Sequence, residues 1–75
     1  MMNFSEALNE AKEGKSIQRR GWNGKGLIVK VQFPDEHSEM TEPYLYIEYP
    51  NGLRCPWICS QTDIMADDWW VVVHE

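Results

Sequence analysis

The five consecutive residues from Trp22 to Gly26 carry the chemical groups that a nucleotide-like anion requires. A tryptophan at the edge of a loop offers a rigid flat face on which a base or a sugar can stack. Asn23 supplies a hydrogen-bond donor and an acceptor, the N–H of Gly24 can approach a phosphate closely, and Lys25 adds a positive charge. The spacing matches neither the P-loop nor the dinucleotide-binding fingerprint. Two interpretations stay open: an anion-binding loop, or an ordinary hairpin turn with a core tryptophan.

A second polar cluster lies at Ser60, Gln61, Thr62 and Asp63. If this segment begins a helix, its free N–H groups favour an anion, and Asp63 could accept a hydrogen bond from a ribose hydroxyl. The alternative is an ordinary capping turn. The acidic pair Asp67 and Asp68 precedes an apolar segment, and we expect it to be a solvated cap rather than a carboxylate dyad.

The positive charges are concentrated in one segment of an acidic chain. The net charge of the 75 residues is −5, which disfavours binding of a nucleic-acid polymer. Residues 15–34 nevertheless hold five basic and no acidic residues, whereas residues 35–75 hold one basic residue against nine acidic ones. Either this segment pairs with the acidic remainder across a sheet, or it forms a dedicated anion site.

The residues predict no enzyme. Cys55 and Cys59 are separated by three residues, and His37 and His74 are the only histidines, so no nucleophile–base pair stands out and the zinc signal is weak. We expect no metal, no cofactor and no disulfide. No apolar run approaches the ~20 residues of a membrane span, and the first residues lead directly into an amphipathic segment. We therefore expect a cytosolic chain that contacts no membrane.

The pattern along the chain predicts an α+β fold. A helix is expected over residues 4–13, with Asn3 and Glu6 as a capping box and Gly14 at its end. Asn23-Gly24 favours a type I′ turn between strands Ile17–Trp22 and Leu27–Phe33. The later elements are expected as a strand over residues 44–49, a turn over 50–52, a strand over 53–58 with Pro56 at a sheet edge, a short helical turn over 60–67 and a strand over 69–73. The prediction is one domain, residues 1–75, with the N-terminal helix packed on a mostly antiparallel sheet of about five strands and a short helix before the last strand.

The short length of the chain predicts that it associates with copies of itself. A core of this size seldom supplies more than roughly 3–5 kcal/mol of net stability, and neither a metal nor a disulfide is expected to add to it. The tryptophans at 57, 69 and 70 are expected in the core and at subunit interfaces. Adjacent Trp69 and Trp70 must point to opposite sides of a strand, so one packs inward and the other faces a neighbour or a helix.

Several blocks together resemble a known family. They are Met-Asn-Phe-Ser-Glu-Ala-Leu at residues 2–8, Arg-Arg-Gly-Trp-Asn-Gly-Lys-Gly at 19–26, the stretch from Pro34 to Tyr46, and Pro-Trp-Ile-Cys-Ser-Gln-Thr-Asp-Ile-Met-Ala-Asp-Asp-Trp at 56–69. Over nearly its whole length the chain resembles the second-type Thoeris anti-defence family of phage and prophage proteins. The resemblance implies a homotetramer in the bacterial host cytoplasm that sequesters a cyclic ADP-ribose-type signal at subunit junctions without cleaving it.

The resemblance also implies roles for individual residues. Trp22 would stack on an adenine or ribose face. Asn23, Gly24 and Lys25 would contact phosphate or ribose, with Arg20 adding charge nearby. The opposing polar wall would consist of Ser60, Gln61, Thr62 and Asp63, and Tyr46 and Trp57 would line the remainder.

Two other functions stay open. The aromatic residues could serve a protein partner, in which case the chain is a small protein–protein interaction module of phage or prophage origin. A small nucleotide hydrolase is the third hypothesis, and it ranks last because no acid–base set or metal site is evident.

Overall fold

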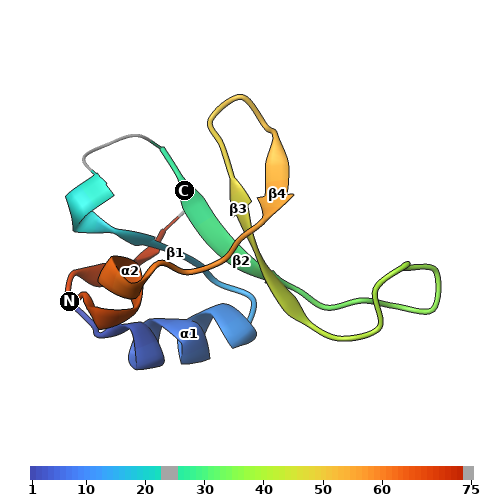
Figure 1. Ribbon diagram of the computed structural model, residues 1–75, viewed down its shortest axis with the longest axis horizontal. Helices are drawn as coiled ribbons and strands as arrows, with labels where there is room; N and C mark the ends of the chain where they lie inside the picture. The colour runs from blue at the N-terminus through green and yellow to red at the C-terminus, as the bar shows by residue number, and fades with distance from the viewer. Residues whose placement is uncertain (23–25, 74–75) are drawn as a thin grey trace.

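The computed structural model describes residues 1–22 and 26–73, which have an α+β fold, and this confirms the predicted fold class (Figure 1). The five strands form one antiparallel sheet in the order β4-β3-β2-β1-β5. The elements run along the chain as α1 (Phe4–Lys12), β1 (Ser16–Arg19), the 3₁₀ turn η1 (Arg20–Trp22), β2 (Ile28–Gln32), β3 (Tyr44–Glu48), β4 (Arg54–Pro56), α2 (Gln61–Met65) and β5 (Trp69–Val72).

Helix α1 begins at Phe4 as predicted and ends at Lys12, one residue before the predicted end. The side chain of Asn3 accepts a hydrogen bond from the N–H of Glu6 at 2.9 Å, and Glu6 accepts from the N–H of Asn3 at 3.1 Å. At the other end Gly14 has φ +97°, and the N–H groups of Gly14 and Lys15 donate to the carbonyls of Ala11 and Glu10. This pattern is a Schellman motif, in which a left-handed glycine satisfies the last carbonyls of a helix.

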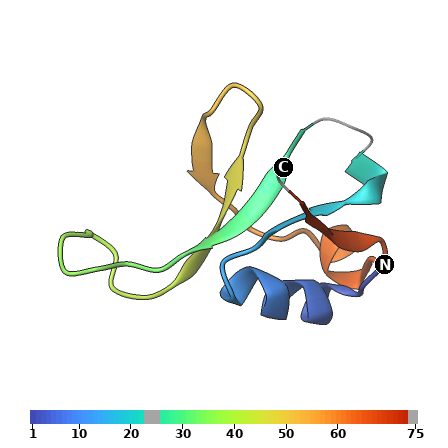
Figure 2. The same cartoon turned by 180° about the vertical axis from the view of Figure 1, so that it is seen from behind.

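The core lies between the sheet and the two helices. Ile17, Val29 and Ile47 lie side by side across β1, β2 and β3, and together with Ala7 and Ala11 of α1 they are buried. We call this side of the sheet the helix face, because α1 packs on β1, β2 and β5 and also against α2. The opposite side, which carries Gln18, Tyr46 and Trp70, is called the open face. Seen from behind, α1 again lies below the strands (Figure 2).

The predicted end of the first strand is wrong. The strand expected over Ile17–Trp22 ends at Arg19, because the N–H of Arg20 donates to the carbonyl of Asp68 at 3.0 Å and the next three residues form η1. The antiparallel pairing of β1 with β2 is confirmed, but their connection spans residues 20–27. The expected type I′ turn at Asn23-Gly24 falls outside the described residues.

The other predicted strand features are confirmed with shorter bounds. β4 lies at the sheet edge, where the missing N–H of Pro56 costs no ladder hydrogen bond. The turn between β3 and β4 contains Gly52 at φ +87°.

The short helix expected before the last strand is also present. Ser60 caps α2 by accepting from the N–H of Asp63 at 3.1 Å. Among the described residues, no helix is long and apolar enough to cross a membrane.

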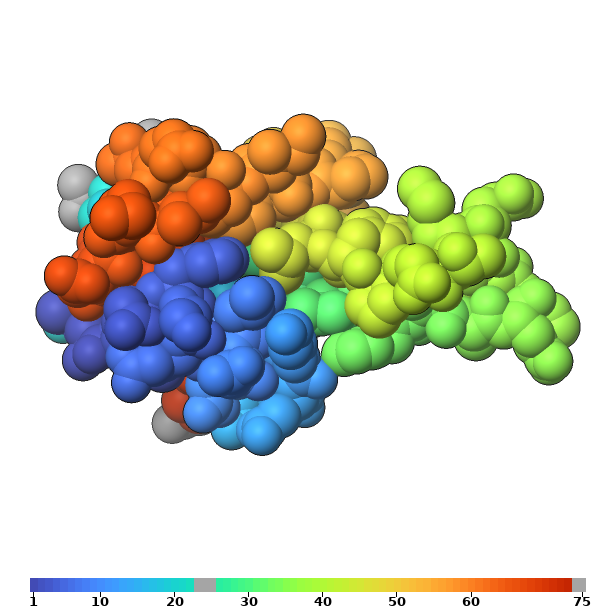
Figure 3. Space-filling model, turned by 60° about the horizontal axis from the view of Figure 1, so that its bottom comes forward, coloured from blue at the N-terminus to red at the C-terminus, as the bar shows by residue number. Residues whose placement is uncertain are grey.

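A long acidic connection projects from this domain. Residues 33–43 join β2 to β3 and extend away from the helices and the sheet (Figures 1 and 3). Where the connection leaves the sheet, a groove of about 240 Å³ lies beside α1. Apolar side chains of Leu8, Val31, Leu45 and the half-exposed Phe33 line it, with Lys12 at the helix side.

The capping box allows a direct test of how α1 is stabilised. Asn3→Ala should lower the free energy of unfolding by about 1 kcal/mol, because it leaves the Glu6 N–H without its side-chain partner. Urea unfolding followed by circular dichroism measures this change. The control is Asn9→Ala, an exposed position inside α1, which should be neutral or stabilising because alanine has the higher helix propensity. Equal losses in the two variants would contradict a specific role of the cap.

Candidate functional site

Three tryptophans gather on the helix face and form what we call the tryptophan cluster: Trp22, Trp57 and Trp69. Their ring centroids lie 5.3 Å apart for Trp22 and Trp69 and 6.1 Å apart for the other two pairs. All three pairs meet edge to face, with interplanar angles of 71° to 83°. This geometry is favourable because the positive edge of one ring meets the negative face of the next.

Only the centre of the cluster is buried completely. Trp69 has no exposed surface, whereas Trp22 and Trp57 are half-buried and pack against the core from its rim. Trp69 also donates from Nε1 to the carbonyl of Asp63 at 2.9 Å, which attaches α2 to the sheet. The structure therefore supports the core interpretation of these side chains, while part of the Trp22 and Trp57 surface remains accessible.

Arg19 connects the elements around this cluster. Its Nη1 donates to Asp63 Oδ1 at 2.7 Å, and its Nε donates to Asp68 Oδ1 at 2.8 Å. Asp68 Oδ2 in turn accepts from the N–H of Gly21 at 2.8 Å. The guanidinium lowers the pKa of the Asp68 carboxyl, and the two carboxylates raise the pKa of Arg19. One ionic network thus joins β1, η1, α2 and the loop before β5.

The ionic network shows that the expected solvated cap at Asp68 is wrong. It also bears on the two interpretations of the positive segment, residues 15–34. Asp68 is not a solvated cap but the partner of Arg19, because the chain folds the loop before β5 against the end of β1. Within the positive segment, Arg19 pairs with two distant acids, and Lys15 pairs with Glu10 and Glu13. These two cations therefore pair with acidic residues, as one interpretation predicts, but with residues of helices and loops rather than across the sheet.

The residues expected to form one site lie on two faces of the sheet. Trp22, Trp57 and the turn from Ser60 to Asp63 surround the tryptophan cluster on the helix face. Ser60 uses its hydroxyl as the cap of α2, and the side chains of Gln61 and Thr62 are exposed. Arg20 and Tyr46 lie on the open face. Asn23, Gly24 and Lys25 fall outside the described residues.

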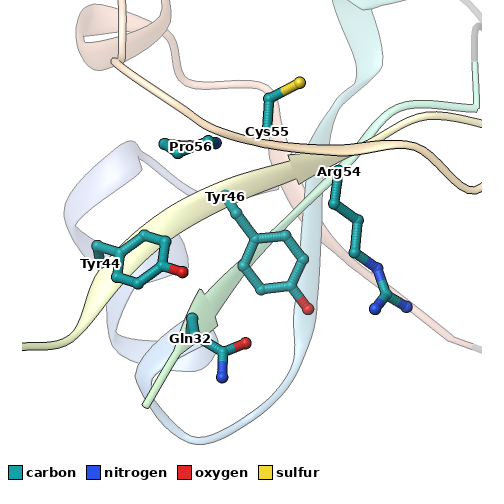
Figure 4. A pocket seen from close by; sticks show the side chains of 6 residues that line it. All are labelled: Gln32, Tyr44, Tyr46, Arg54, Cys55 and Pro56. Carbon is teal, nitrogen blue, oxygen red and sulfur yellow. The ribbon is translucent and has the colours of Figure 1, made fainter. Parts of the chain in front are cut away.

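On the open face, Tyr46 lies in a shallow hollow of about 120 Å³ (Figure 4). Gln32, Tyr44 and Arg54 point to the same side of the sheet as Tyr46, whereas the sulfur of Cys55 points away from them. The Arg54 guanidinium lies 6.0 Å from the centroid of the Tyr46 ring and donates from Nε to Glu48 at 2.7 Å. The hollow therefore offers aromatic surface with a paired cation at its edge.

Arg20 and Trp70 form a second cation–aromatic pair on the open face. The guanidinium of Arg20 lies 5.9 Å from the centroid of the Trp70 ring. Trp70 Nε1 is buried and has no hydrogen-bond partner among the described residues. The prediction that Trp69 and Trp70 face opposite sides is confirmed, because Trp69 is buried on the helix face and Trp70 on the open face contacts Arg20.

Sequence reasoning missed Arg19 and Asp68, although one signal for Arg19 was present. Residues two apart in a strand share a face, so Arg19 must point to the same side as the apolar Ile17. A charged side chain on a core-facing position requires a partner, because an unpaired buried charge is costly. No local pattern marks Asp68 as that partner, since it lies 49 residues along the chain.

The two cysteines are free thiols in different surroundings. Cys55 is exposed on β4, whereas Cys59 is half-buried beside the network. Burial, followed by the nearby charge of Asp63, raises the pKa of the Cys59 thiol from its ordinary 9.0 to about 11. At pH 8 only about one Cys59 in a thousand is then a thiolate, and the thiolate is the reactive form.

Thiol labelling tests this difference. At pH 8 the native protein should react with an aromatic disulfide reagent at one thiol quickly, and a Cys55→Ser variant should lose that fast phase. The rate at Cys59 should rise about tenfold for each pH unit until it levels off near pH 11, because the thiolate fraction grows in that proportion. Complete labelling of both thiols in denaturant serves as the control. Equal rates for the two native thiols at pH 8 would contradict the assignment.

Comparison with known proteins identifies the family to which this chain belongs. The family model described as a Thoeris anti-defense 2-like domain matches residues 2–72. A protein of Bacillus phage SP01 named Thoeris anti-defense 2 is 31% identical over 84 aligned residues, which cover 95% of this chain and 94% of that relative. The match spans η1, the tryptophan cluster and α2. The chain therefore belongs to the Thoeris anti-defense 2-like family, and its function is anti-defence.

Proposed function

We propose that the protein acts in anti-defence by binding and sequestering a cyclic ADP-ribose-type nucleotide signal, without cleaving it. The observation that carries the proposal is the tryptophan cluster, where two partly exposed indoles lie beside an aspartate held in place by an arginine. An indole provides stacking surface for an adenine ring, and a carboxylate accepts hydrogen bonds from ribose hydroxyls.

Asp63 is suited to recognise a hydroxyl rather than a phosphate. Its Oδ1 accepts from Arg19, and its side chain is 15% exposed. A carboxylate has about four lone-pair positions on its two oxygens, so the Arg19 contact leaves acceptor capacity for a ligand donor. A phosphate would be repelled by this anion, so we propose that the ligand's phosphates lie away from Asp63 and contact Asn23, Gly24 and Lys25.

We further propose that the protein is a homotetramer whose pockets lie at subunit junctions. Arg20 and Tyr46 lie on the face opposite Trp22 and Asp63, so one ligand reaches all four residues only if two protomers contribute opposite faces. Apolar side chains on the described surface also favour self-association. Ile58, which precedes α2, is 93% exposed, and Met65, the last residue of α2, is 76% exposed.

Binding without catalysis is consistent with the chemistry of the described residues. The pKa of Cys59, about 11, keeps this thiol protonated at neutral pH and therefore a poor nucleophile. His37 lies on the exposed connection between β2 and β3, 3.4 Å from a Glu36 oxygen and remote from the cluster.

An interaction module for a protein partner is the second candidate. The apolar groove beside α1, with its half-exposed Phe33, is the observation that favours it. Ligand titration separates the two candidates, because the groove and the tryptophan cluster are formed by different side chains.

The sequestration proposal predicts that the ligand is released intact. Protein saturated with glycocyclic ADP-ribose and then heat-denatured should return the unmodified compound, which chromatography with mass detection measures. Native mass spectrometry of the saturated protein before heating should give a tetramer that retains ligand. A hydrolysed product would replace the proposal with an enzymatic function, and absence of retained ligand beside a captured protein partner would favour the interaction module.

The stacking role of Trp22 is tested by Trp22→Leu, which keeps apolar volume at the rim of the core. Loss of a stacked base should weaken binding of glycocyclic ADP-ribose by about tenfold or more in a calorimetric titration. Phe33→Leu is the matched control, because it removes an exposed aromatic ring from the groove beside α1, which the tryptophan cluster does not line. Unchanged affinity in the Trp22 variant would remove this residue from the site.

A further inference from the structure

The inward-facing Arg19 is the most unusual side chain of the helix face. It follows the fully buried Ile17 by two residues, so β1 directs it into the same layer. Its side chain is 17% exposed, and that of Asp63 is 15% exposed. Hydrophobic residues of similar volume are often at least as stabilising as a buried ion pair, so stability alone does not account for an arginine here.

The geometry of the guanidinium explains why this residue is an arginine. Nη1 and Nε donate in different directions, one to Asp63 on α2 and one to Asp68 before β5. A planar fork with fixed donor directions can hold two carboxylates at a set separation, whereas a lysine ammonium acts as a single flexible point charge. Arg19 therefore sets the position of α2 relative to the loop before β5.

Gly21 provides a second, independent indication of close fit. A Cβ atom at this position would lie 2.9 Å from Asp68 Oδ2 and 3.2 Å from Arg19 Nη2. Gly21 is not among the glycines with positive φ, so its backbone does not itself require glycine. The missing side chain instead lets the N–H of Gly21 reach the carboxylate at 2.8 Å, and the next residue is Trp22.

We propose that Arg19 is a positioning residue that couples the two walls of the candidate site. Through Asp63 it fixes the wall on α2, and through Asp68 and Gly21 it fixes the turn that carries Trp22. The indole face and the carboxylate of Asp63 are then held at a fixed separation before the ligand arrives. Such preorganisation reduces the entropy lost on binding.

This inference rests on the proposed function for its effect on affinity, but the positioning itself can be measured without ligand. The four tryptophan indole N–H groups give separate signals in a ¹⁵N correlation spectrum. The Trp69 signal reports on α2, because its Nε1 donates to the Asp63 carbonyl, and the Trp22 signal reports on η1. In Arg19→Lys both signals should shift. The control Lys15→Gln removes an ion pair with Glu10 and Glu13 at the end of α1, outside the candidate site, and should leave both signals in place.

Binding then separates positioning from a general loss of stability. Arg19→Lys should weaken binding of glycocyclic ADP-ribose by about tenfold while the protein stays folded at the assay temperature, and Lys15→Gln should not. Because Arg19 acts partly through Trp22, the Arg19→Lys, Trp22→Leu double variant should lose less than the product of the two single effects. If Arg19 has only a structural role, the losses of affinity in the two single variants should multiply in the double variant.

Gly21→Ala is the second variant, because it keeps every charge and displaces only Asp68 and Arg19. It should reproduce the indole shifts and the loss of affinity, and it decides the test if Arg19→Lys does not fold. Unchanged indole signals in a folded Arg19→Lys or Gly21→Ala protein, or fully multiplicative losses of affinity, would overturn the proposal. If the wild-type protein binds no probe, the proposed function fails, while the indole signals still decide whether Arg19 positions the two walls.

Discussion

Burial of Trp69 is the interaction on which the rest of this small domain depends. Its side chain is fully buried, and its backbone N–H and carbonyl both bond to Met2, at 3.1 and 2.8 Å. Phe4 packs on its ring at a centroid distance of 5.2 Å, and its Nε1 bonds to α2. A single large apolar side chain thereby joins the N-terminus, α1, α2 and β5. In a domain of 75 residues, one such indole is a large share of the core.

The two faces of the sheet differ in how they use charge. On the helix face the guanidinium of Arg19 pairs with two carboxylates, which leaves this network with one negative charge in excess. On the open face Arg20 and Arg54 lie against the aromatic rings of Trp70 and Tyr46. An arginine on an aromatic ring keeps a flat cationic surface exposed at low entropic cost. The open face therefore suits an anionic or aromatic neighbour, whereas the helix face suits one with apolar and hydroxyl groups.

Local signals in the sequence predicted most of the elements but not every boundary. Asn3, Glu6 and Gly14 determined α1, because caps are satisfied within a few residues of the chain. Pro56 correctly indicated an edge strand, because it cannot donate to a ladder. The predicted end of β1 at Trp22 was wrong, because the N–H of Arg20 donates to the carbonyl of Asp68 and the strand stops at Arg19. A contact with the far end of the chain overrode the local preference for extension.

By itself the sequence determined the α+β class, the family and the presence of aromatic and polar residues suited to a nucleotide. Only the tertiary structure decided how those residues are distributed, because sheet order and strand facing depend on contacts between distant segments. Arg19 meets partners 44 and 49 residues away, and no periodicity encodes that pairing. The same order of strands directs Trp22 and Asp63 to one face and Tyr46 to the other. Local patterns specify which face of a strand is apolar, whereas the packing of the whole chain specifies what each face meets.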